Sequence, residues 1–220
     1  MKGVMKAGIK GKRKIIVYIA TSADGYIARP DGSVDWLNRP RPVDNYEMGA
    51  FYKSIDTILW GRKTYELTLE FGGSSSAGGK SGRKIKNYVF STKSALPSAA
   101  GVEFVSEPIT AFAQRLRTTP GKHIWMMGGG GLIASFLDQG EVDEFIIHVI
   151  PTFIGEGIPL IAPRHRTVHL KLLSTKTWSD GVVRLHYAVV RQAAARGGSR
   201  EDRAQGWRAK RETGVRKDSE

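Results

Sequence analysis

Four consecutive glycines, Gly128–Gly131, separate a short apolar run from a helical pattern, and this junction limits what the chain can fold into. The apolar run His123–Met127 has the length and composition of a buried strand. Leu132–Asp138 has the spacing of a short helix, and Gly140 follows as a stop signal. A strand that passes through glycines directly into a helix is a building unit of layered α/β folds. The sequence therefore predicts an α/β protein.

The rest of the chain repeats this alternation, with about eight strands and four helices. The expected strands are Lys14–Ala20, Thr57–Trp60, Asn87–Ser91, Val102–Val105, His123–Met127, Glu144–Pro151, Leu170–Trp178 and Val182–Val190. The expected helices cover Asp44–Ser54, Thr64 to about Phe71, Pro108 to about Arg117, and Leu132–Asp138. Ser179-Asp180-Gly181 is a strong hairpin signal. We therefore expect a mixed sheet, parallel in the middle and antiparallel at its C-terminal edge.

Charge is distributed unevenly along the chain, whose formal net charge is +13. Residues 1–14 contain six Lys or Arg and no acid, and residues 191–220 contain nine against five acids, which leaves +3 for residues 15–190. Such charged ends without apolar periodicity are usually solvated. We therefore expect one folded domain over residues 14–190, with a basic tail at 1–13 and a basic, disordered tail at 191–220. The tails are solubilising in one interpretation and arms for nucleic acid in another.

Several classes of protein are disfavoured by composition. No apolar run approaches the roughly 18–20 residues that cross a bilayer, and the first fourteen residues lack the apolar segment of a secretory signal. Cysteine is absent, which excludes disulfides, thiolate nucleophiles and cysteine-ligated metals. His165 and His169 are four residues apart but have no third candidate ligand nearby. We expect a soluble, cytoplasmic protein without a metal or membrane partner.

The glycine run is also a candidate anion site. Glycine lets a backbone approach a phosphate closely, and the free N–H groups at the start of a helix attract negative charge. A tight turn that binds nothing is the alternative. The dinucleotide fingerprint G-x-G-x-x-G would need glycine at Ile133, and no Gly-Lys-Ser/Thr follows as in a P-loop. The context favours phosphate binding without matching either motif.

Two further apolar runs end in groups that suit anions. The first leads into Gly61-Arg62-Lys63-Thr64 at the start of a helix, and the second into Ser91-Thr92-Lys93. Helix capping and solvated charge are the alternative roles of the first set. In open α/β sheets, ligands bind outside the carboxyl ends of the strands. The three strand ends together therefore predict a site for an elongated, multiply phosphorylated ligand such as a dinucleotide.

Taken in order, these segments resemble the dihydrofolate reductase-like superfamily, specifically the reductase domain at the C-terminus of the bifunctional riboflavin-biosynthesis deaminase/reductase and its stand-alone relatives. The motifs that carry the resemblance are Ser22–Ala28, Val34–Leu37, Gly61–Glu66, Gly128–Leu132, Val142–Glu144 and Pro151–Leu160. The resemblance extends from about Lys14 to Val190. It implies a three-layer fold, a central mixed sheet flanked by helices, and NADPH lying across the strand ends.

The resemblance also implies residue roles. The implied cofactor-binding residues are Trp36, Gly61, Arg62, Lys63, Thr64, Ser91, Thr92, Lys93, Gly128, Gly129, Gly130, Gly131 and Leu132. The glycine run would contact the cofactor phosphates. The residues of Gly61–Thr64 would hold the pyrophosphate and 2′-phosphate region, and those of Ser91–Lys93 would contact the adenosine end. Trp36 would lie beside the nicotinamide, unless it is a core aromatic residue.

The substrate side departs from the riboflavin-pathway relatives. Those proteins place a carboxylate immediately before the glycine run, where this chain has Met127. They also have an Asp-Asp-Pro segment and a substrate-binding arginine, whereas this chain has residues 69–73 and a Gly/Ser loop at that place. The deaminase half is absent as well. The substrate class therefore stays open among pterin-, pyrimidine- and carbonyl-type molecules.

Acidic residues near the expected cleft are the candidates for proton donation. Asp44 and Asp35 are the catalytic candidates; a helix cap is the alternative for Asp44, and lining of the pocket is a further role for Asp35. The remaining substrate candidates are Asp24, Glu47, Met127, Gly155 and Gly157. The alternatives are a turn position for Asp24, a solvated helix face for Glu47, and a tight turn for Gly155 and Gly157.

The sequence as a whole favours an NADPH-dependent reductase that transfers hydride to a small planar or carbonyl-containing substrate, with a homodimer implied by the resemblance. One alternative is a nucleic-acid-binding protein that uses Lys2–Lys14 and Arg191–Lys217 as arms. A dinucleotide-binding protein without turnover is another.

Overall fold

The structure is a computed structural model that describes residues 12–70, 85–91 and 101–191. Its secondary structure belongs to one unit that ends at Val190. In chain order the elements are β1 (Ile15–Ser22), β2 (Tyr26–Ala28), η1 (Asp35–Leu37), η2 (Asn45–Glu47), α1 (Met48–Ser54), β3 (Ile55–Gly61), α2 (Arg62–Glu70), β4 (Lys86–Phe90), β5 (Val102–Val105), α3 (Ile109–Thr118), β6 (His123–Gly128), α4 (Gly130–Asp138), β7 (Glu144–Ile150), β8 (Ile158–Pro159), β9 (Leu170–Thr177) and β10 (Val183–Val189).

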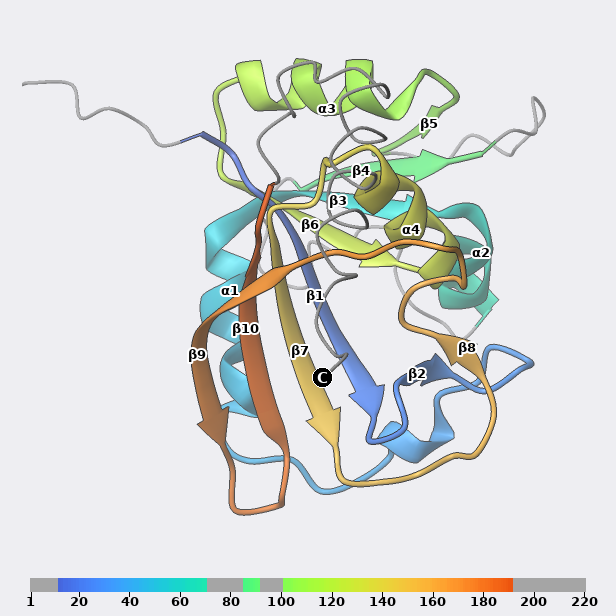
Figure 1. Ribbon diagram of the computed structural model, residues 1–220, viewed down its shortest axis with the longest axis vertical. Helices are drawn as coiled ribbons and strands as arrows, with labels where there is room; N and C mark the ends of the chain where they lie inside the picture. The colour runs from blue at the N-terminus through green and yellow to red at the C-terminus, as the bar shows by residue number, and fades with distance from the viewer. Residues whose placement is uncertain (1–11, 71–84, 92–100, 192–220) are drawn as a thin grey trace, which may run out of the picture. The chain divides into compact units, whose positions relative to one another are not determined.

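The central element is an eight-stranded sheet in the order β5-β4-β3-β6-β1-β7-β10-β9 (Figure 1). Neighbouring strands from β5 to β7 pair in parallel, and β10 pairs antiparallel with both β7 and β9. The expected mixed sheet with a C-terminal antiparallel hairpin and four α-helices is therefore confirmed. A second, two-stranded sheet of β2 and β8, not expected from the sequence, lies beside it.

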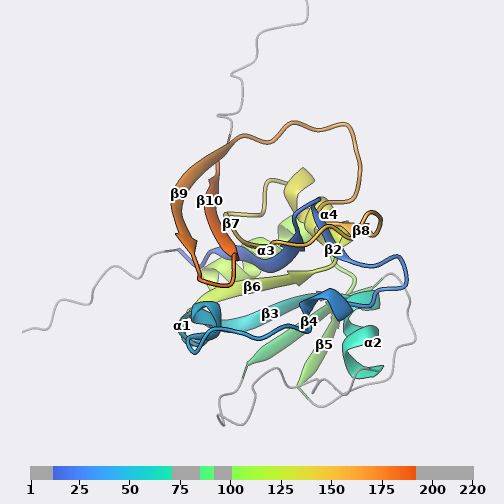
Figure 2. The same cartoon turned by 90° about the horizontal axis from the view of Figure 1, so that it is seen from below.

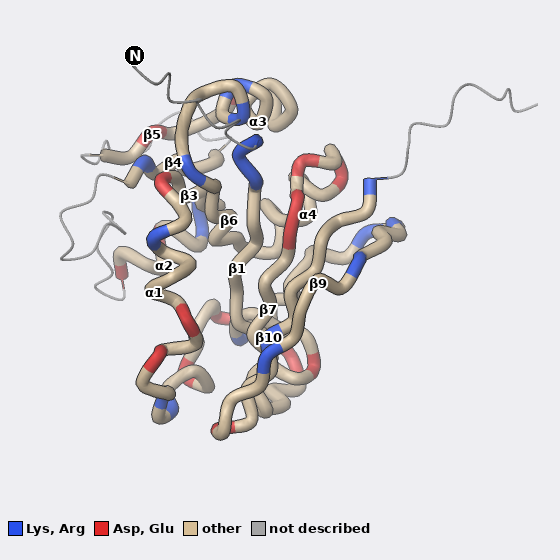
Figure 3. The backbone as a smooth tube through the Cα atoms, turned by 90° about the vertical axis from the view of Figure 1, so that its left-hand side faces the viewer, with Lys and Arg blue, Asp and Glu red and all other residues tan. Residues whose placement is uncertain are grey.

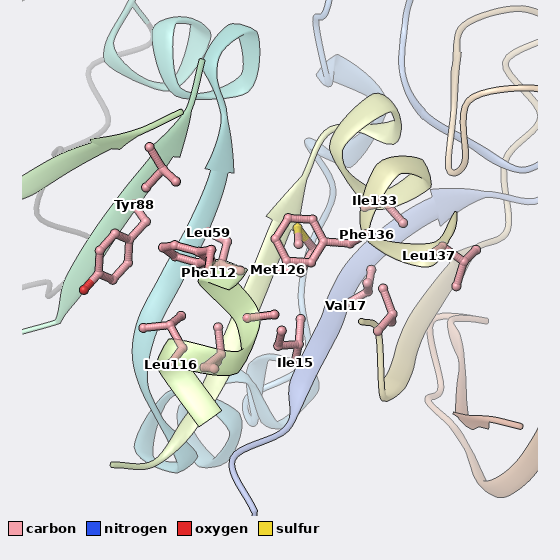
Figure 4. Packing of buried hydrophobic residues seen from close by; sticks show 14 of the residues in the cluster. Ile15, Val17, Leu59, Tyr88, Phe112, Leu116, Met126, Ile133, Phe136 and Leu137 are labelled. Carbon is pink, nitrogen blue, oxygen red and sulfur yellow. The ribbon is translucent and has the colours of Figure 1, made fainter. Parts of the chain in front are cut away.

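Helices cover both faces of the sheet, with α1 and α2 on one side and α3 and α4 on the other (Figure 2). The side chains of Phe112 on α3 and Phe136 on α4 are fully buried against sheet residues that include Met126 (Figure 4). On the opposite face, Phe51 and Tyr65 pack with Trp125 in a second core. Strands buried on both faces form continuous apolar runs, which explains why these segments lack alternation in the sequence. In the described residues, no helix is long and apolar enough to cross a membrane.

The N-terminal boundary differs from the expected one. Charge counting places Arg13 in the basic tail, but its side chain is only 6% exposed and is ion-paired with Asp56. Its guanidinium also donates to Thr57 Oγ1 at 2.8 Å and to the carbonyl oxygen of Lys122 at 2.6 Å. An arginine buried in this way is held by its partners and belongs to the fold. Residues 1–11 and 192–220, which form most of the two expected tails, lie outside the described residues.

The helix after the glycine run starts earlier than expected, at Gly130. A Cβ at that position would lie 2.4 Å from the carbonyl oxygen of Pro159, and the Gly130 carbonyl accepts a hydrogen bond from Ala162 N–H at 3.1 Å. The backbone of α4 therefore packs directly against the backbone around β8. By contrast, a Cβ at Gly131 would meet nothing within 4 Å. The two neighbouring glycines have different roles, the first in packing and the second in leaving space.

This difference predicts opposite effects of two alanine substitutions. Gly130→Ala should destabilise the protein by about 1–3 kcal/mol, because its methyl group must displace backbone. Gly131→Ala should leave stability unchanged or raise it by up to about 1 kcal/mol, because alanine restricts the unfolded chain and favours helix. Urea unfolding of both variants beside the wild type provides the measurement. Equal stabilities of the two variants would contradict the packing role of Gly130.

Candidate active site

Two cavities open at the carboxyl ends of the central strands. The first, called here the aromatic cavity, has a volume of about 280 Å³. Its lining residues are Tyr18, Ile19, Ala20, Leu37, Arg39, Arg41, Asn45, Tyr46, Met48, Trp125, Met127, His148 and Ile150. The second, called here the glycine cavity, has a volume of about 810 Å³. Its lining residues are Pro30, Asp31, Gly32, Gly61, Arg62, Lys63, Thr64, Glu66, Leu67, Glu70, Gly129, Gly130, Gly131, Leu132 and Ile158.

The glycine cavity brings together two of the three strand ends predicted from the sequence. A Cβ on Gly129 would lie 3.0 Å from Thr64 Oγ1, and one on Gly61 would lie 3.2 Å from the carbonyl oxygen of Gly128. The absence of side chains therefore lets the two loops touch. The first N–H groups of α4 have no acceptor within the helix, and they add the positive end of the helix dipole to this wall. Such a wall suits phosphate groups.

Basic side chains stand at the other side of the glycine cavity. The Arg62 guanidinium lies 2.7 Å from a carboxylate oxygen of Glu66, one turn along α2, and Lys63 is exposed. Arg62 also lines a neighbouring cavity of about 320 Å³ together with Ser91, at the end of β4. The third predicted strand end is thus placed beside the first two. Thr92 and Lys93 lie outside the described residues.

The walls of the aromatic cavity are mainly flat rings. Tyr18 and Trp125 lie edge to face with ring centroids 6.2 Å apart, and the ring of His148 is 4.9 Å from that of Tyr18. Tyr18 donates a hydrogen bond to the carbonyl oxygen of Tyr46 at 3.2 Å, and burial raises the pKa of its hydroxyl to about 12. None of the residues that line this cavity carries a carboxylate. The cavity is therefore suited to a flat molecule held by stacking and a few polar contacts.

One wall of the aromatic cavity has an unusual backbone. Asn45, Tyr46 and Glu47 have φ values of 44°, 56° and 60°, in the left-handed region that non-glycine residues seldom adopt. Three consecutive residues of this kind cost on the order of 1–3 kcal/mol each and persist only where surrounding contacts impose them. Strained segments of this type concentrate at functional sites.

The contacts that hold this wall come from the C-terminal hairpin. Tyr46 donates a 2.6 Å hydrogen bond from its hydroxyl to Asp180, and Glu47 forms ion pairs with Lys176 and Arg184. Chain segments more than 125 residues apart are joined here. Because Glu47 is engaged in these pairs, its position indicates a structural rather than a substrate-binding role.

Neither predicted catalytic acid lines the aromatic cavity. Asp44 accepts hydrogen bonds from Trp178 Nε1 at 3.1 Å, and the bond from Trp178 is the main reason that the pKa of Asp44 lies below its ordinary value. Asp35 forms an exposed ion pair with Arg29. Both carboxylates lie at the surface as ionised partners, so the structure does not support their predicted role as proton donors.

The other predicted residues divide into lining and supporting groups. Met127 lines the aromatic cavity, and its contact with a substrate stays a prediction. Trp36 is buried in a separate cluster with Ile150 and Val182, and its neighbour Leu37 lines the cavity instead. This position agrees with the alternative of a core residue, and the place of Trp36 beside a nicotinamide stays a prediction.

Asp24, Gly155 and Gly157 support the loop that follows β7. A hydrogen bond with Ser22, followed by bonds from the N–H groups of Gly155 and Ile154, holds the pKa of Asp24 below its ordinary value. Gly155 adopts a φ of +81°, and a Cβ on Gly157 would lie 2.2 Å from the carbonyl oxygen of Ala28. For these three residues the structure supports the turn-forming alternative.

Among the polar residues that line the aromatic cavity, sequence reasoning left out Arg39, Arg41 and Asn45, and it interpreted His148 as a core residue. Arg39 donates to the carbonyl oxygen of Asp180 at 2.6 Å, whereas Arg41 has no carboxylate partner within the described part of the chain. The Pro-Arg-Pro pattern around Arg41 is the signal that could have suggested an exposed cation near the site.

Along the described backbone, Lys and Arg are interspersed with Asp and Glu (Figure 3). A duplex-binding face needs clustered positive charge. The predicted basic arms, apart from Lys12–Lys14 and Arg191, lie outside the described residues, so nucleic-acid binding through them stays a prediction.

The ion pairs of Glu47 predict a pH-dependent stability. Lys176 and Arg184 hold the pKa of Glu47 below its ordinary value of 4.5, so the folded state binds this proton less readily than the unfolded chain does. Their stabilisation is present above about pH 4.5 and is lost as the pH falls through the lower folded pKa. Glu47→Gln should therefore lower the free energy of unfolding by about 1 kcal/mol or less at pH 7 and by less at pH 3.5.

Urea unfolding at the two pH values measures this difference. Glu156→Gln, a change at an exposed carboxylate, is the matched control and should show no such pH dependence. A Glu47→Gln effect of the same size at both pH values would contradict the electrostatic explanation.

Comparisons with known proteins agree with this architecture. The profile of the family described as the RibD C-terminal domain matches residues 13–184. The uncharacterized protein YwjB of Bacillus subtilis (strain 168) is 37% identical over 180 residues, which cover 80% of this chain and 98% of YwjB. The uncharacterized protein YyaP of the same organism is 35% identical over 185 residues, which cover 80% of this chain and 95% of YyaP.

Solved structures show the same fold. A Shewanella sp. PV-4 protein, assigned by its description to riboflavin biosynthesis, superimposes with a TM-score of 0.71 at 26% identity, over 81% of this chain and 99% of that one. Dihydrofolate reductase from Enterococcus faecalis superimposes with a TM-score of 0.57 at 14% identity, over 81% of this chain and 97% of that one. The reductase-type fold expected from the motifs is confirmed, and the chain belongs to the RibD C-terminal domain family.

Proposed function

We propose that this protein is an NADPH-dependent reductase that transfers hydride to a small planar pterin-, pyrimidine- or carbonyl-type substrate. The observation that carries the proposal is the junction of the two cavities at the end of β6, where Met127 lines the aromatic cavity and Gly129, two residues on, lines the glycine cavity. A cofactor in one cavity and a flat substrate in the other would meet at this strand end. Family membership and the fold shared with a dihydrofolate reductase complexed with NADP(H) support this assignment.

The residues of the glycine cavity fit the phosphates of NADPH. The N–H groups at the start of α4 and the Thr64 hydroxyl would hold the pyrophosphate, while Arg62 and Lys63 would face the 2′-phosphate. Ser91 would contact the adenosine end from the neighbouring cavity. When bound, NADPH supplies the hydride, and the protein supplies position, exclusion of water and electrostatics.

The aromatic cavity would orient the substrate by stacking on Tyr18 and Trp125 and would exclude water around the reacting carbon. Arg41, which has no carboxylate partner in the described residues, would pair with an anionic substituent at the mouth. No lining carboxylate is available to donate a proton. The proton that completes the reduction would therefore come from water or from another lining group.

Cofactor binding tests the proposal directly. The wild type should bind NADPH at micromolar concentration in a calorimetric titration, run in parallel with NADH. Gly131→Val should weaken NADPH binding at least tenfold, because the side chain enters open space in the glycine cavity without meeting protein atoms near its Cβ.

Ser135→Val, on the exposed surface of the same helix one turn later, is the matched control and should bind as the wild type does. Failure of the wild type to bind either nucleotide would refute the proposal. Unchanged binding by Gly131→Val would show that the cofactor lies elsewhere.

We further propose that the protein is a homodimer that pairs through its outer hairpin. Leu170, Leu172, Leu173 and Val190 are 43–51% exposed at this end of the sheet, which is more apolar surface than single scattered residues present. Leu172→Lys should shift the mass measured by light scattering toward that of the monomer, whereas Ser174→Lys on the same strand should not. A wild-type protein that is monomeric at high micromolar concentration would contradict the dimer.

A further inference from the structure

Most polar groups of the aromatic cavity are already occupied by contacts within the protein. The Tyr18 hydroxyl donates to a backbone carbonyl, the Tyr46 hydroxyl donates to Asp180, and Arg39 donates to the Asp180 carbonyl oxygen. His148 differs, because its Nε2 makes no hydrogen bond of ordinary geometry although the side chain is only 4% exposed. The backbone of Tyr46 and of Ile19 lies near enough to the imidazole to act on its pKa, but it does not satisfy Nε2. A buried polar atom without a partner costs about 1–3 kcal/mol, so its retention at a cavity wall needs an explanation.

The position of His148 is set by the sheet. It lies in β7 opposite Ala20 of β1 and Arg184 of β10. Its ring is surrounded by those of Tyr18, Tyr46 and Trp178, with centroids 4.9, 5.9 and 5.7 Å away. Three rings from three different segments therefore fix the plane of the imidazole in the cavity wall.

His148 is neutral at physiological pH. Burial, and secondarily the positive charge of Arg184, lower the pKa of the imidazole to about 4. A neutral imidazole offers one hydrogen-bond donor and one acceptor, and it can therefore match an uncharged N–H or C=O group. It forms no ion pair that would compete for this contact.

Access to Nε2 involves the strained wall. Tyr46 packs against the imidazole and belongs to the segment Asn45–Glu47, whose backbone is left-handed throughout. A ligand that reaches Nε2 must displace part of this cover. The segment already stores backbone strain, which lowers the cost of moving it relative to a relaxed wall.

We propose that His148 is the specificity-determining residue of the aromatic cavity and that it selects planar heterocycles by hydrogen-bonding their polar edge through Nε2. This inference rests on the proposed function for the role of the cavity as a substrate site. The class that it selects is a flat ring whose edge presents a ring N–H or C=O group, in preference to a hydrocarbon ring of the same shape.

Two probes and two variants test the role of His148. The probes are pterin-6-carboxylate, which has a polar ring edge, and 2-naphthoate, which has the same anionic group on a hydrocarbon ring. Calorimetry on the full chain with saturating NADPH should show at least tenfold tighter binding of the pterin. His148→Leu should remove most of this preference by weakening pterin binding about tenfold while leaving 2-naphthoate binding unchanged.

His148→Gln should restore much of the preference, because its amide lies near the position of Nε2. Thermal unfolding separates this role from a structural one: His148→Leu should melt no lower than the wild type, because it removes an unpartnered buried polar atom. The proposal would be overturned if the wild type bound the pterin no better than the naphthoate, or bound neither. It would also be overturned if His148→Leu kept the same preference for the pterin as the wild type. NADPH binding, measured separately in each variant, tests the proposed function independently, and the probe titrations can be repeated without NADPH if it fails.

Discussion

The close approach of two backbones, at Gly130 and Pro159, positions both cavities. A side chain at residue 130 would overlap the Pro159 carbonyl oxygen, so α4 can start where it does only because that residue is glycine. The segment that carries Pro159 also reaches the turn after β1, where Leu160 N–H donates to the Gly25 carbonyl oxygen at 3.1 Å. The end of β1, the end of β6 and the start of α4 are thereby held as one rigid group. The packing of the protein itself therefore requires glycine in this run, independently of any ligand.

Carboxylates are kept out of the lining of the aromatic cavity. The acids nearest to the aromatic cavity, among them Asp44, Glu47 and Asp180, are paired with cations or indole N–H groups at its edge. Moving any of them into an apolar cavity unpaired would cost several kcal/mol. The lining therefore combines neutral polar groups with two arginines and no carboxylate. Such a lining favours ligands that are recognised by their shape and by single hydrogen bonds, without a contact to a protein carboxylate.

Local patterns in the sequence predicted the fold and the neighbouring positions of two strand-end motifs. Strand, glycine and helix signals occupy neighbouring residues, and the rule that ligands bind at strand carboxyl ends then brings Gly61–Thr64 and Gly128–Leu132 together. The aromatic cavity depends on contacts between distant parts of the chain that no local pattern records. The helix-cap alternative for Asp44 could be foreseen, and Asp44 does accept a hydrogen bond from Tyr46 N–H, but its second partner Trp178 is 134 residues away. His148 was interpreted as a core residue, because its unpaired nitrogen is visible only when the surrounding rings are placed. Arg13 was counted with a tail for the same reason, since its partner Asp56 lies on another strand.

The C-terminal hairpin supplies none of the residues that line the aromatic cavity, yet it holds one wall of that cavity in place. Residues of β9, β10 and their turn hold the left-handed segment Asn45–Glu47 through Asp180, Lys176 and Arg184, and Trp178 packs against His148. Neither cavity has a residue from this hairpin in its lining, so the hairpin acts on the aromatic cavity through these supporting contacts. Substitutions in the hairpin can therefore reshape the aromatic cavity while the glycine cavity stays intact. Under the proposed function, this separation gives the fold a physical route to new substrates with an unchanged cofactor site, because the two cavities meet at one strand end but are supported by different parts of the chain.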